Sequence, residues 1–226
     1  MLPRVILFNA VSLDGRIDWF TSDVGQFYEL ASHWQEDATL AGSNTIYNPD
    51  EALPEEGESA FAPPVVDPND TRPLLVVPDS RGRVRNWHQI RQWPYWRGMV
   101  ALCSQATPGS YLDYLRQRHV DYIVAGEDHV DLRAALEGLS ARYGVRVVRV
   151  DSGGTLNGAL LRAGLVDEVS LLIYPNLVGG TTPRSFFRAP DLTTAEGVIP
   201  LKLTHVEQLQ NGVLWLRYEL IKPPTV

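Results

Sequence analysis

The chain has 226 residues, 44% of them hydrophobic and 21% charged, which is the balance of an ordinary globular protein with a full core. A net charge of −7 argues against a broad nucleic-acid-binding surface, and no apolar run approaches the roughly 18 residues of a membrane span. The apolar run before Asp14 is too short for a secretory signal, so we expect a cytoplasmic protein without membrane or nucleic-acid partners.

Apolar runs alternate with helical patterns along most of the chain. In chain order, the sequence predicts a strand at 5–11, a helix at 22–33, strands at 38–41, 74–77 and 99–102, a helix at 109–118, a strand at 122–125, a helix at 131–143 capped by Asp131, a strand at 145–150, a helix at 154–163 and a strand at 168–174. The first strand hardly alternates in polarity, so both of its faces should be buried. Thr21 or Ser22 is the expected cap of the first helix.

The end of the chain changes character. Two alternating strands, at 201–208 and 213–220, are separated by Gln210-Asn211-Gly212, which is a strong hairpin signal. Strand–helix–strand repeats imply parallel pairing, so the sequence predicts an α/β fold with a mostly parallel central sheet and an antiparallel C-terminal hairpin. We expect one domain over 1–226, in which the acidic, aperiodic residues 48–72 form a loop or a lid.

The most informative segment for chemistry is 145–164. An apolar strand ends at Asp151, Gly153 and Gly154 follow, and a helix opens at Thr155. Glycines let the backbone approach a ligand, and free amides at a helix start attract phosphate. A tight strand-to-helix turn without any ligand explains the same pattern, and the segment is not the G-x-G-x-x-G fingerprint of a Rossmann domain.

Small or phosphate-binding residues also follow three other predicted strands, at 12–16, 42–45 and 79–81. Ligands of open α/β sheets collect outside the carboxyl ends of the strands, so a shared cleft is more plausible than four unrelated turns. The five histidines show no metal-binding spacing, and we expect no metal. Cys103 lies in an apolar run and should be a buried small residue rather than a catalytic thiol.

These motifs resemble those of the riboflavin-biosynthesis reductases, which form the C-terminal half of the bacterial bifunctional deaminase–reductase and stand alone in archaea and fungi. Ser12-Leu13-Asp14-Gly15-Arg16 is similar to the family's S-L-D-G-[RK] signature, and the segments 153–158, 163–168 and 175–180 are similar to its longest motif. The matching set spans residues 5–180. The sequence contains no zinc deaminase motif, so we expect the stand-alone form.

The resemblance implies a three-layer, dihydrofolate-reductase-like fold, a homodimer, and NADPH lying across the strand ends. Positions that contact the cofactor in the family fall at Asn9, Trp19, Thr45, Ser80, Arg81, Gly153, Gly154, Thr155, Leu156, Asn157 and Gly158. Ser80 and Arg81 are placed to meet the 2′-phosphate, which predicts a preference for NADPH over NADH. The hairpin, with Trp215 expected to be exposed, is the predicted dimer surface.

The resemblance also implies a small-molecule substrate, a (di)aminopyrimidine 5′-phosphate whose ribosylamino group is reduced to ribitylamino in riboflavin biosynthesis. The family's substrate-orienting Glu is replaced here by Asp151, for which a helix-capping role is the alternative. Asp50, Leu53 and Arg72 are the predicted substrate-binding residues. Asp14 is expected to be a structural hydrogen-bonding residue rather than a proton donor.

Two positions depart from the family's pattern: an arginine that holds the substrate phosphate in the family falls at or near Glu56, and another, present in some members, falls at His33. Their loss removes bidentate phosphate recognition and leaves Arg72 as a candidate substitute. Three interpretations therefore stay open: the riboflavin-pathway reductase, an NADPH-dependent reductase of an unphosphorylated pterin- or dihydrofolate-like heterocycle, and a dimeric NADP(H)-binding protein without catalysis.

Overall fold

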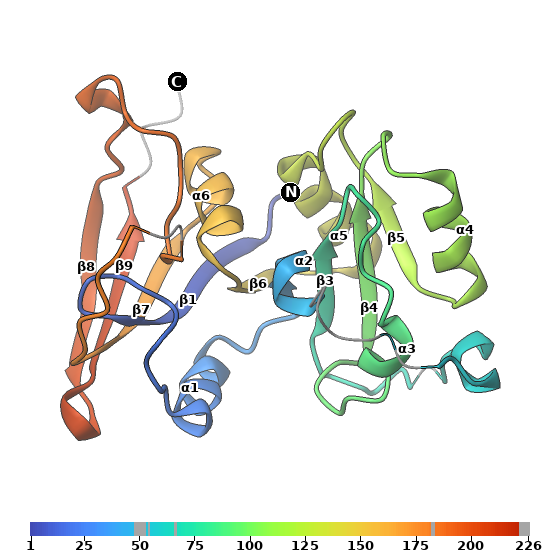
Figure 1. The fold of residues 1–226 in the computed structure, drawn as a ribbon, viewed down its shortest axis with the longest axis horizontal. Coiled ribbons are helices and arrows are strands. Elements are labelled where there is room, and N and C mark those ends of the chain that lie inside the picture. The colour runs from blue at the N-terminus through green and yellow to red at the C-terminus, as the bar shows by residue number, and fades with distance from the viewer. Residues whose placement is uncertain (48–52, 54, 66, 182–183, 222–226) are drawn as a thin grey trace. The chain divides into compact units, whose positions relative to one another are not determined.

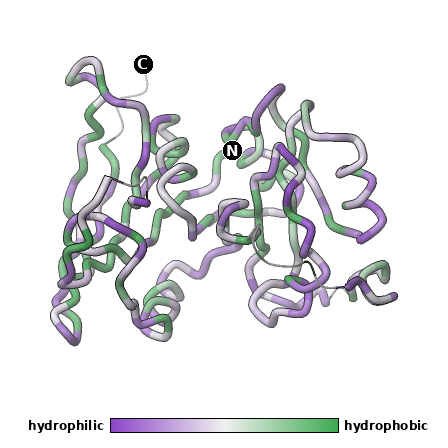
Figure 2. The backbone as a smooth tube through the Cα atoms, in the orientation of Figure 1, coloured by the Kyte–Doolittle hydropathy of each residue, from purple (hydrophilic) through white to green (hydrophobic). Residues whose placement is uncertain are grey.

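Nine β-strands and the helices between them form an α/β fold in the described part of the chain, with mostly parallel strands and a final antiparallel hairpin, as the sequence predicts. The computed structural model describes residues 1–47, 53, 55–65, 67–181 and 184–221. Residues 1–3 with 36–148 form one compact unit, and 4–35 with 149–226 form a second one (Figure 1). The single domain over 1–226 stays a prediction. Hydrophobic residues concentrate in the strands and hydrophilic ones in the connecting loops (Figure 2).

Four parallel strands form the sheet of the first unit, in the order β5-β4-β3-β2. Its elements in chain order are β2 (Ala38–Ala41), α2 (Ser43–Ile46), the 3-10 turn η2 (Glu58–Phe61), β3 (Leu74–Pro78), α3 (Trp87–Ile90), β4 (Gly98–Cys103), α4 (Gly109–Gln117), β5 (Asp121–Val124) and α5 (Leu132–Tyr143). The sequence does not predict α2, α3 or η2, because four residues are too few to show a helical period. Asp131 caps α5 as predicted, its carboxylate accepting from the Ala134 amide at 3.0 Å.

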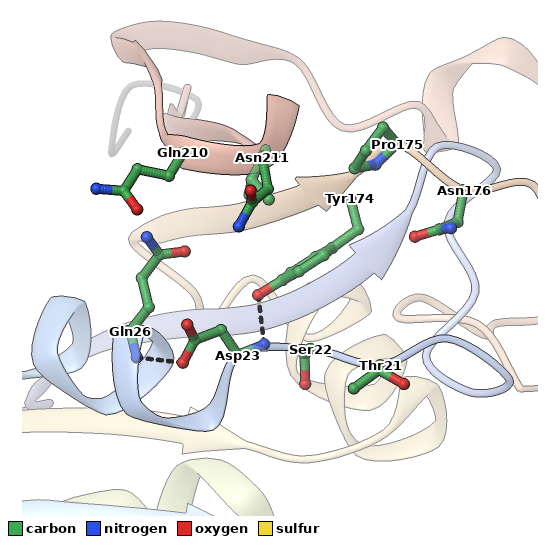
Figure 3. Close-up of a pocket in the computed structure, with 10 residues that line it drawn as sticks. Thr21, Ser22, Asp23, Gln26, Tyr174, Pro175, Asn176, Gln210 and Asn211 are labelled. Atoms are coloured by element: carbon green, nitrogen blue, oxygen red, sulfur yellow. Dashed lines mark hydrogen bonds between the residues drawn. The ribbon is translucent and has the colours of Figure 1, made fainter.

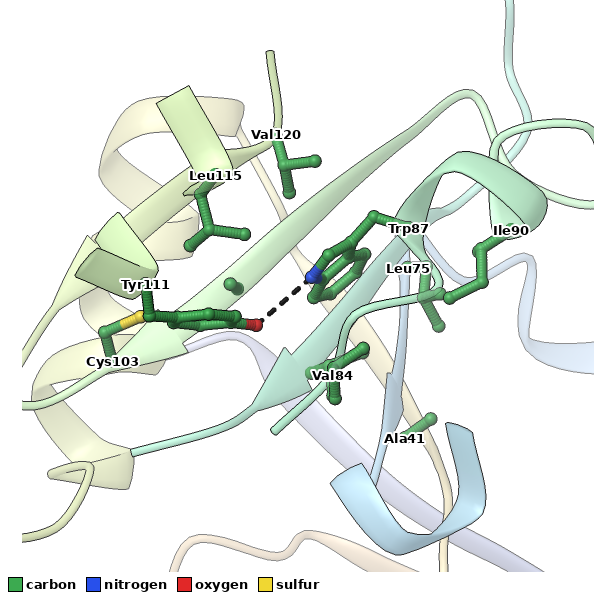
Figure 4. Close-up of a cluster of buried hydrophobic side chains, with 11 residues drawn as sticks. Ala41, Leu75, Val84, Trp87, Ile90, Cys103, Tyr111, Leu115 and Val120 are labelled. Atoms are coloured by element: carbon green, nitrogen blue, oxygen red, sulfur yellow. Dashed lines mark hydrogen bonds between the residues drawn. The ribbon is translucent and has the colours of Figure 1, made fainter. Parts of the chain in front are cut away.

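Helices cover both faces of this sheet. On one face, Trp87 of α3 and Tyr111 of α4 pack over Cys103, and the indole donates to the phenol at 3.1 Å (Figure 4). Cys103 is in register with Val124, so the preceding residue, Ile123, points to the opposite face of the sheet. There it lies against Gly138 of α5. Cys103 is fully buried, as predicted, and this burial raises the pKa of its thiol to about 12.

Five strands form the second unit, in the order β6-β1-β7-β9-β8, with β1 and β7 parallel and the last two antiparallel. Its elements in chain order are β1 (Arg4–Ser12), α1 (Val24–Ala31), the 3-10 turn η1 (Ser32–Trp34), β6 (Val147–Asp151), α6 (Gly154–Arg162), β7 (Glu168–Tyr174), the 3-10 turn η3 (Ala195–Gly197), β8 (Leu201–Gln208), the 3-10 turn η4 (Gln210–Gly212) and β9 (Leu214–Leu220). None of the helices in the described ranges has the length and apolar character that a membrane span requires.

Strand β1 is buried on both faces, as its apolar run predicts. Phe8 stacks on Phe27 of α1 with ring centroids 4.4 Å apart, whereas the next residue, Asn9, accepts from the Asn157 side chain of α6 at 2.9 Å. Successive residues of a strand point to opposite faces, so α1 and α6 cover opposite sides of this sheet. The helices therefore enclose the strand from which the site is built.

The start of α1 differs from the prediction. Asp23, not Thr21 or Ser22, is the N-cap, and its carboxylate accepts from the Gln26 amide at 3.0 Å. The Asp23 amide in turn donates to the Tyr174 hydroxyl at 2.9 Å. This long-range bond fixes which residue begins the helix, and local sequence does not show it.

A buried carboxylate, Glu168 at the start of β7, connects three other elements. It is 1% exposed and accepts from Arg4 of β1 at 2.6 Å, from Arg217 of β9 at 2.6 Å and from the Trp34 indole of η1 at 3.3 Å. A buried charge is tolerated when it is paired and hydrogen-bonded in this way. The network therefore joins both neighbours of β7 to the end of the first helix.

The C-terminal hairpin forms as predicted, but its tryptophan is not exposed. Trp215 is 6% exposed and donates to the Ser170 hydroxyl at 2.9 Å, because its register with Leu172 turns it toward the face that α1 covers. The opposite face of the hairpin carries exposed apolar side chains. We call this group the hairpin patch; it consists of Leu201, Leu203, Val206 and Leu214.

We expect Glu168→Gln to destabilise the protein by about 3 kcal/mol, because it removes the buried negative charge that pairs with Arg4 and Arg217. Urea unfolding followed by circular dichroism measures this change. Glu207→Gln is the matched control, since its side chain is 49% exposed and should change stability by less than about 0.5 kcal/mol. Equal effects of the two substitutions would contradict the role assigned to Glu168.

Candidate active site

The carboxyl ends of neighbouring strands meet at one edge of the second unit. Ser12 of β1 and Tyr174 of β7 are register partners, and the Ser152 carbonyl after β6 accepts from the Asn9 side chain at 2.8 Å. Asp151 is the last residue of β6 and is partly exposed. Ligands of α/β sheets bind at such edges, so this is where the chemistry is expected.

Helix α6 begins at this edge without a side-chain cap. Its N-cap, Gly153, makes no side-chain bond, and the first amides of the helix, from Gly154 to Leu156, have no partner within the helix. Thr155 in this turn is exposed. Amides at the positive end of a nine-residue helix that have no partner among the described residues suit a phosphate group, so these residues fit the predicted cofactor.

Two predicted cofactor residues, Asn9 and Asn157, are hydrogen-bonded to each other beneath this helix start. Asn157 is fully buried, and its amide also donates to the Phe186 carbonyl at 2.8 Å. The pair fixes the turn between β6 and α6, which is a positioning role. Direct contact of either side chain with a cofactor stays a prediction.

Two of the predicted glycines are needed for packing. A Cβ on Gly154 would collide with the Ser185 carbonyl oxygen, and one on Gly158 would collide with the Arg188 carbonyl oxygen. The Arg188 amide donates to the Gly154 carbonyl at 3.0 Å, so the segment after β7 runs directly along α6. Close approach of backbone explains these glycines without a ligand, and their contact with a cofactor stays a prediction.

Asp14 joins the turn after β1 to the loop after β7. Its carboxylate accepts from the Ser12 hydroxyl at 2.6 Å and from the amides of Val178 and Gly179 at 3.1 and 2.6 Å. These bonds, the Ser12 hydroxyl first, lower the pKa of Asp14 from 3.8 to about 2. A carboxylate ionised this strongly is a poor proton donor, so the structural role expected from the sequence is what the geometry supports.

Sequence reasoning missed two side chains beside Asp151. Oδ2 of Asp151 lies 3.3 Å from Nη1 of Arg149, and the Tyr28 hydroxyl donates to the same oxygen at 3.5 Å. Arg149 lies in an apolar strand and Tyr28 is far away in sequence, so spacing gives no signal. The Asp151 carboxylate is thus positioned by a buried guanidinium, and it does not cap α6, whose N-cap is Gly153.

In the first unit, the predicted positions Thr45, Ser80 and Arg81 gather after β2 and β3, which are parallel neighbours. Thr45 and Arg81 are exposed, and Ser80 is partly exposed. Arg83, a residue that the sequence does not mark as part of a site, donates to the Ser43 hydroxyl at 2.7 Å and so ties the loop after β3 to α2. The predicted 2′-phosphate residues therefore lie beside a fixed helix.

The remaining predicted residues are scattered. Trp19 in the second unit is 86% exposed, and Leu53 in the first is 50% exposed. Asp50 lies outside the described residues. Arg72 donates to both carboxylate oxygens of Asp70, with distances of 2.6 to 3.1 Å, and to the Pro94 carbonyl at 2.8 Å. A phosphate at Arg72 would have to compete with these acceptors.

The two replaced family arginines have structural partners. Glu56 accepts from the Arg118 guanidinium at 2.7 Å, and this pairing lowers the pKa of Glu56. Nε2 of His33 lies 2.8 Å from Nη1 of Arg217, and burial followed by the charge of Arg217 lowers the pKa of His33. Because an arginine can only donate, Nε2 of His33 accepts this hydrogen bond and is not available to a phosphate. Both replacements therefore serve packing within their own units.

A pocket of about 420 Å³ opens in the second unit between the start of α1, the end of β7 and the hairpin turn (Figure 3). Its lining is mostly neutral and polar: Thr21, Ser22, Asp23, Gln26, Tyr174, Pro175, Asn176, Gln210, Asn211 and Val213. None of the predicted site residues lines it. The pocket therefore lies at the carboxyl end of β7, on the same edge of the sheet, but Asp151 and the start of α6 do not line it.

The architecture is shared with solved structures. A pyrimidine reductase-like protein from Corynebacterium diphtheriae superimposes with a TM-score of 0.73 at 19% identity, covering 98% of this chain and 93% of that one. The fold thus defines the class as dihydrofolate-reductase-like α/β proteins. The RibD C-terminal domain model matches residues 3–215, so the chain belongs to that family, as its motifs predict, and hence to a family of oxidoreductases.

Two archaeal relatives match along nearly their whole length, and both are named 2,5-diamino-6-ribosylamino-4(3H)-pyrimidinone 5′-phosphate reductase. The protein of Methanothermobacter thermautotrophicus is 31% identical over 217 residues, covering 90% of this chain and 92% of its own. That of Archaeoglobus fulgidus is 33% identical over 220 residues, covering 93% and 94%. By contrast, the chain spans 49% of the Escherichia coli riboflavin biosynthesis protein RibD.

We expect Gly158→Ala to destabilise the protein by about 2 kcal/mol, because the added methyl group meets the Arg188 carbonyl. Thermal unfolding without any ligand measures the change. Gly109→Ala is the matched control, since nothing lies within 4 Å of its Cβ position and alanine suits a helix. Unchanged stability with weaker cofactor binding would instead assign Gly158 to ligand approach.

Proposed function

We propose that the protein is an NADPH-dependent reductase that converts the ribosylamino group of a (di)aminopyrimidine 5′-phosphate to a ribitylamino group in riboflavin biosynthesis. The observation that carries the proposal is the uncapped start of α6 directly after Asp151, which puts a phosphate-binding turn beside a carboxylate. The names of the two full-length archaeal relatives support the choice of substrate.

The residues of this chain contribute binding and orientation. The amides from Gly154 to Leu156 hold a phosphate of the cofactor, and Asp151 accepts hydrogen bonds from N–H groups of the pyrimidine. When bound, NADPH supplies the hydride that reduces C1′ of the ring-opened imine. Holding the two reactants in place provides most of the acceleration for such a transfer.

Selectivity for NADPH is assigned to Ser80 and Arg81, which follow β3 in the first unit. An exposed guanidinium with an adjacent hydroxyl is suited to the 2′-phosphate that distinguishes NADPH from NADH. Comparable turnover with NADH would contradict this assignment.

One observation favours a second candidate substrate. The guanidinium of Arg72, the proposed substitute for the family's phosphate-binding arginines, is engaged by Asp70 and by the Pro94 carbonyl. An unphosphorylated pterin- or dihydrofolate-like heterocycle needs no such arginine. NADPH binding without turnover of any heterocycle would leave the third alternative, a non-catalytic binding protein.

We also propose that the protein is a homodimer that associates through the hairpin patch. Exposed apolar side chains clustered on one sheet face mark interaction sites, and a two-fold contact lets the same patch cover itself. Leu203 and Val206 are 50% and 59% exposed although they belong to a regular strand.

Asp151→Asn is expected to lower kcat/KM for the phosphorylated diaminopyrimidinone roughly 10- to 100-fold, because a charged acceptor is lost, with little change in KM for NADPH. The absorbance of NADPH is followed with this substrate, with its deaminated counterpart and with an unphosphorylated pterin. Asp191→Asn, an exposed carboxylate in the same unit, is the control. Turnover of the pterin alone would replace the riboflavin intermediate with the second candidate.

Val206→Asp should convert the dimer to a monomer in sedimentation analysis at micromolar concentration, because a buried charge in the patch would lack a partner. Val198→Asp is the matched control, since this equally exposed valine lies outside the strand. A wild-type protein that sediments as a monomer would dismiss the dimer proposal.

A further inference from the structure

Arg149 and Tyr28 surround the substrate-orienting carboxylate, yet neither has a role in the proposed function above. Arg149 and Asp151 are two residues apart on β6 and therefore project from the same face of the strand. The Arg149 side chain is 4% exposed and the Asp151 side chain is 29% exposed. The guanidinium is thus more deeply buried than the carboxylate, which is partly exposed.

Tyr28 is held beside the same group by the packing of its helix. The preceding residue, Phe27, stacks on Phe8 of the core, and the rings of Phe27 and Tyr28 meet edge to face with centroids 5.2 Å apart. Tyr28 is 54% exposed, and its ring lies 5.8 Å from the Arg149 guanidinium. A partly exposed aromatic ring therefore lies next to Asp151.

Both contacts converge on one carboxylate oxygen. Oδ2 of Asp151 meets Arg149 and Tyr28, whereas Oδ1 has no hydrogen-bond partner among the described residues. An ionised carboxylate has about four acceptor positions, so Oδ1 and the outer side of Oδ2 are left to accept from a ligand.

We propose that Arg149 and Tyr28 determine the specificity of this site for a planar heterocycle with adjacent N–H groups. Arg149 is a positioning residue that acts through Asp151, and Tyr28 is an aromatic wall on which the ring stacks. The inference rests on the proposed function, because that function assigns the heterocycle to Asp151. The inference goes beyond that function by naming the side chains that select the heterocyclic ring.

The first experiment measures binding of 2,6-diaminopyrimidin-4-one, a heterocycle without ribose or phosphate, by calorimetry, and KM for the full substrate. Arg149→Met should weaken both roughly tenfold, with kcat and the KM for NADPH within about twofold, and Arg149→Lys should restore part of the loss. Tyr28→Leu should weaken both roughly tenfold by removing stacking, whereas Tyr28→Phe should change them less than about threefold. Arg146→Met is the control, because its side chain is 86% exposed and is paired with Asp37.

A double-mutant cycle separates positioning from general stability. If Arg149 acts through Asp151, Arg149→Met should add little further loss of binding to Asp151→Asn, whereas independent roles would add in full. Full additivity, or unchanged binding in both Arg149 variants, would overturn the inference. If Arg149→Met fails to fold, Arg149→Lys and the Tyr28 pair still test it.

The outcome also distinguishes this inference from the proposed function. Suppose that the wild-type protein binds the pyrimidinone probe, that Arg149→Met abolishes this binding, and that the wild-type protein does not reduce the phosphorylated substrate. This result would support the binding site and reject the proposed reaction. Wild-type protein that reduces the substrate with unchanged KM in the Arg149 and Tyr28 variants would support the reaction and reject the inference. Wild-type protein that does not bind the probe would reject the inference.

Discussion

The buried amide of Asn157 is the interaction on which the candidate site of the second unit depends. Its nitrogen donates to Asn9 in β1, to the Phe186 carbonyl after β7 and, at 3.4 Å, to the Ser152 carbonyl after β6. Three segments that are distant in sequence are thereby fixed to one residue of α6. Because an unpaired polar group costs most when it is buried, this arrangement strongly favours one geometry of the turn. The free amides of the helix start and the carboxylate of Asp151 take their positions from it.

Several carboxylates accept hydrogen bonds from other groups of the protein. Glu168 binds two arginines and Asp14 binds two backbone amides, and in each of these side chains both oxygens have a partner. Asp151 differs, because one of its oxygens is engaged while the other is available. The availability of an oxygen, more than the number of acidic residues, distinguishes a binding carboxylate from a structural one.

The sequence predicts the parts of the fold that local pattern determines. The apolar run of β1, the Asp131 cap and the Asn211-Gly212 turn, whose φ angles are 58° and 74°, all signal their structure within a few residues. The errors depend on distant partners. Tyr174 selects Asp23 as the first cap, and the register with β7 buries Trp215.

The candidate site shows the same division. The motif from Gly153 to Gly158 identifies the family and marks the turn, so the sequence is enough to find it. Arg149 cannot be found in this way, because an arginine within an apolar strand carries no spacing signal and its contact with Tyr28 exists only after folding. Glu56 and His33 can be recognised as departures from the family, but their partners Arg118 and Arg217 cannot be inferred from spacing.

The last strands illustrate how one inserted residue changes the character of a surface. Leu203 is in register with Tyr218 and His205 with Arg217, so Thr204 is an extra residue in β8 that β9 does not match. Without this extra residue, His205 would lie on the same face as Leu201 and Leu203, and Val206 would be in register with Trp215. The additional residue reverses the alternation midway along the strand, and an ordinary mixed sequence thereby acquires one apolar face and one polar face.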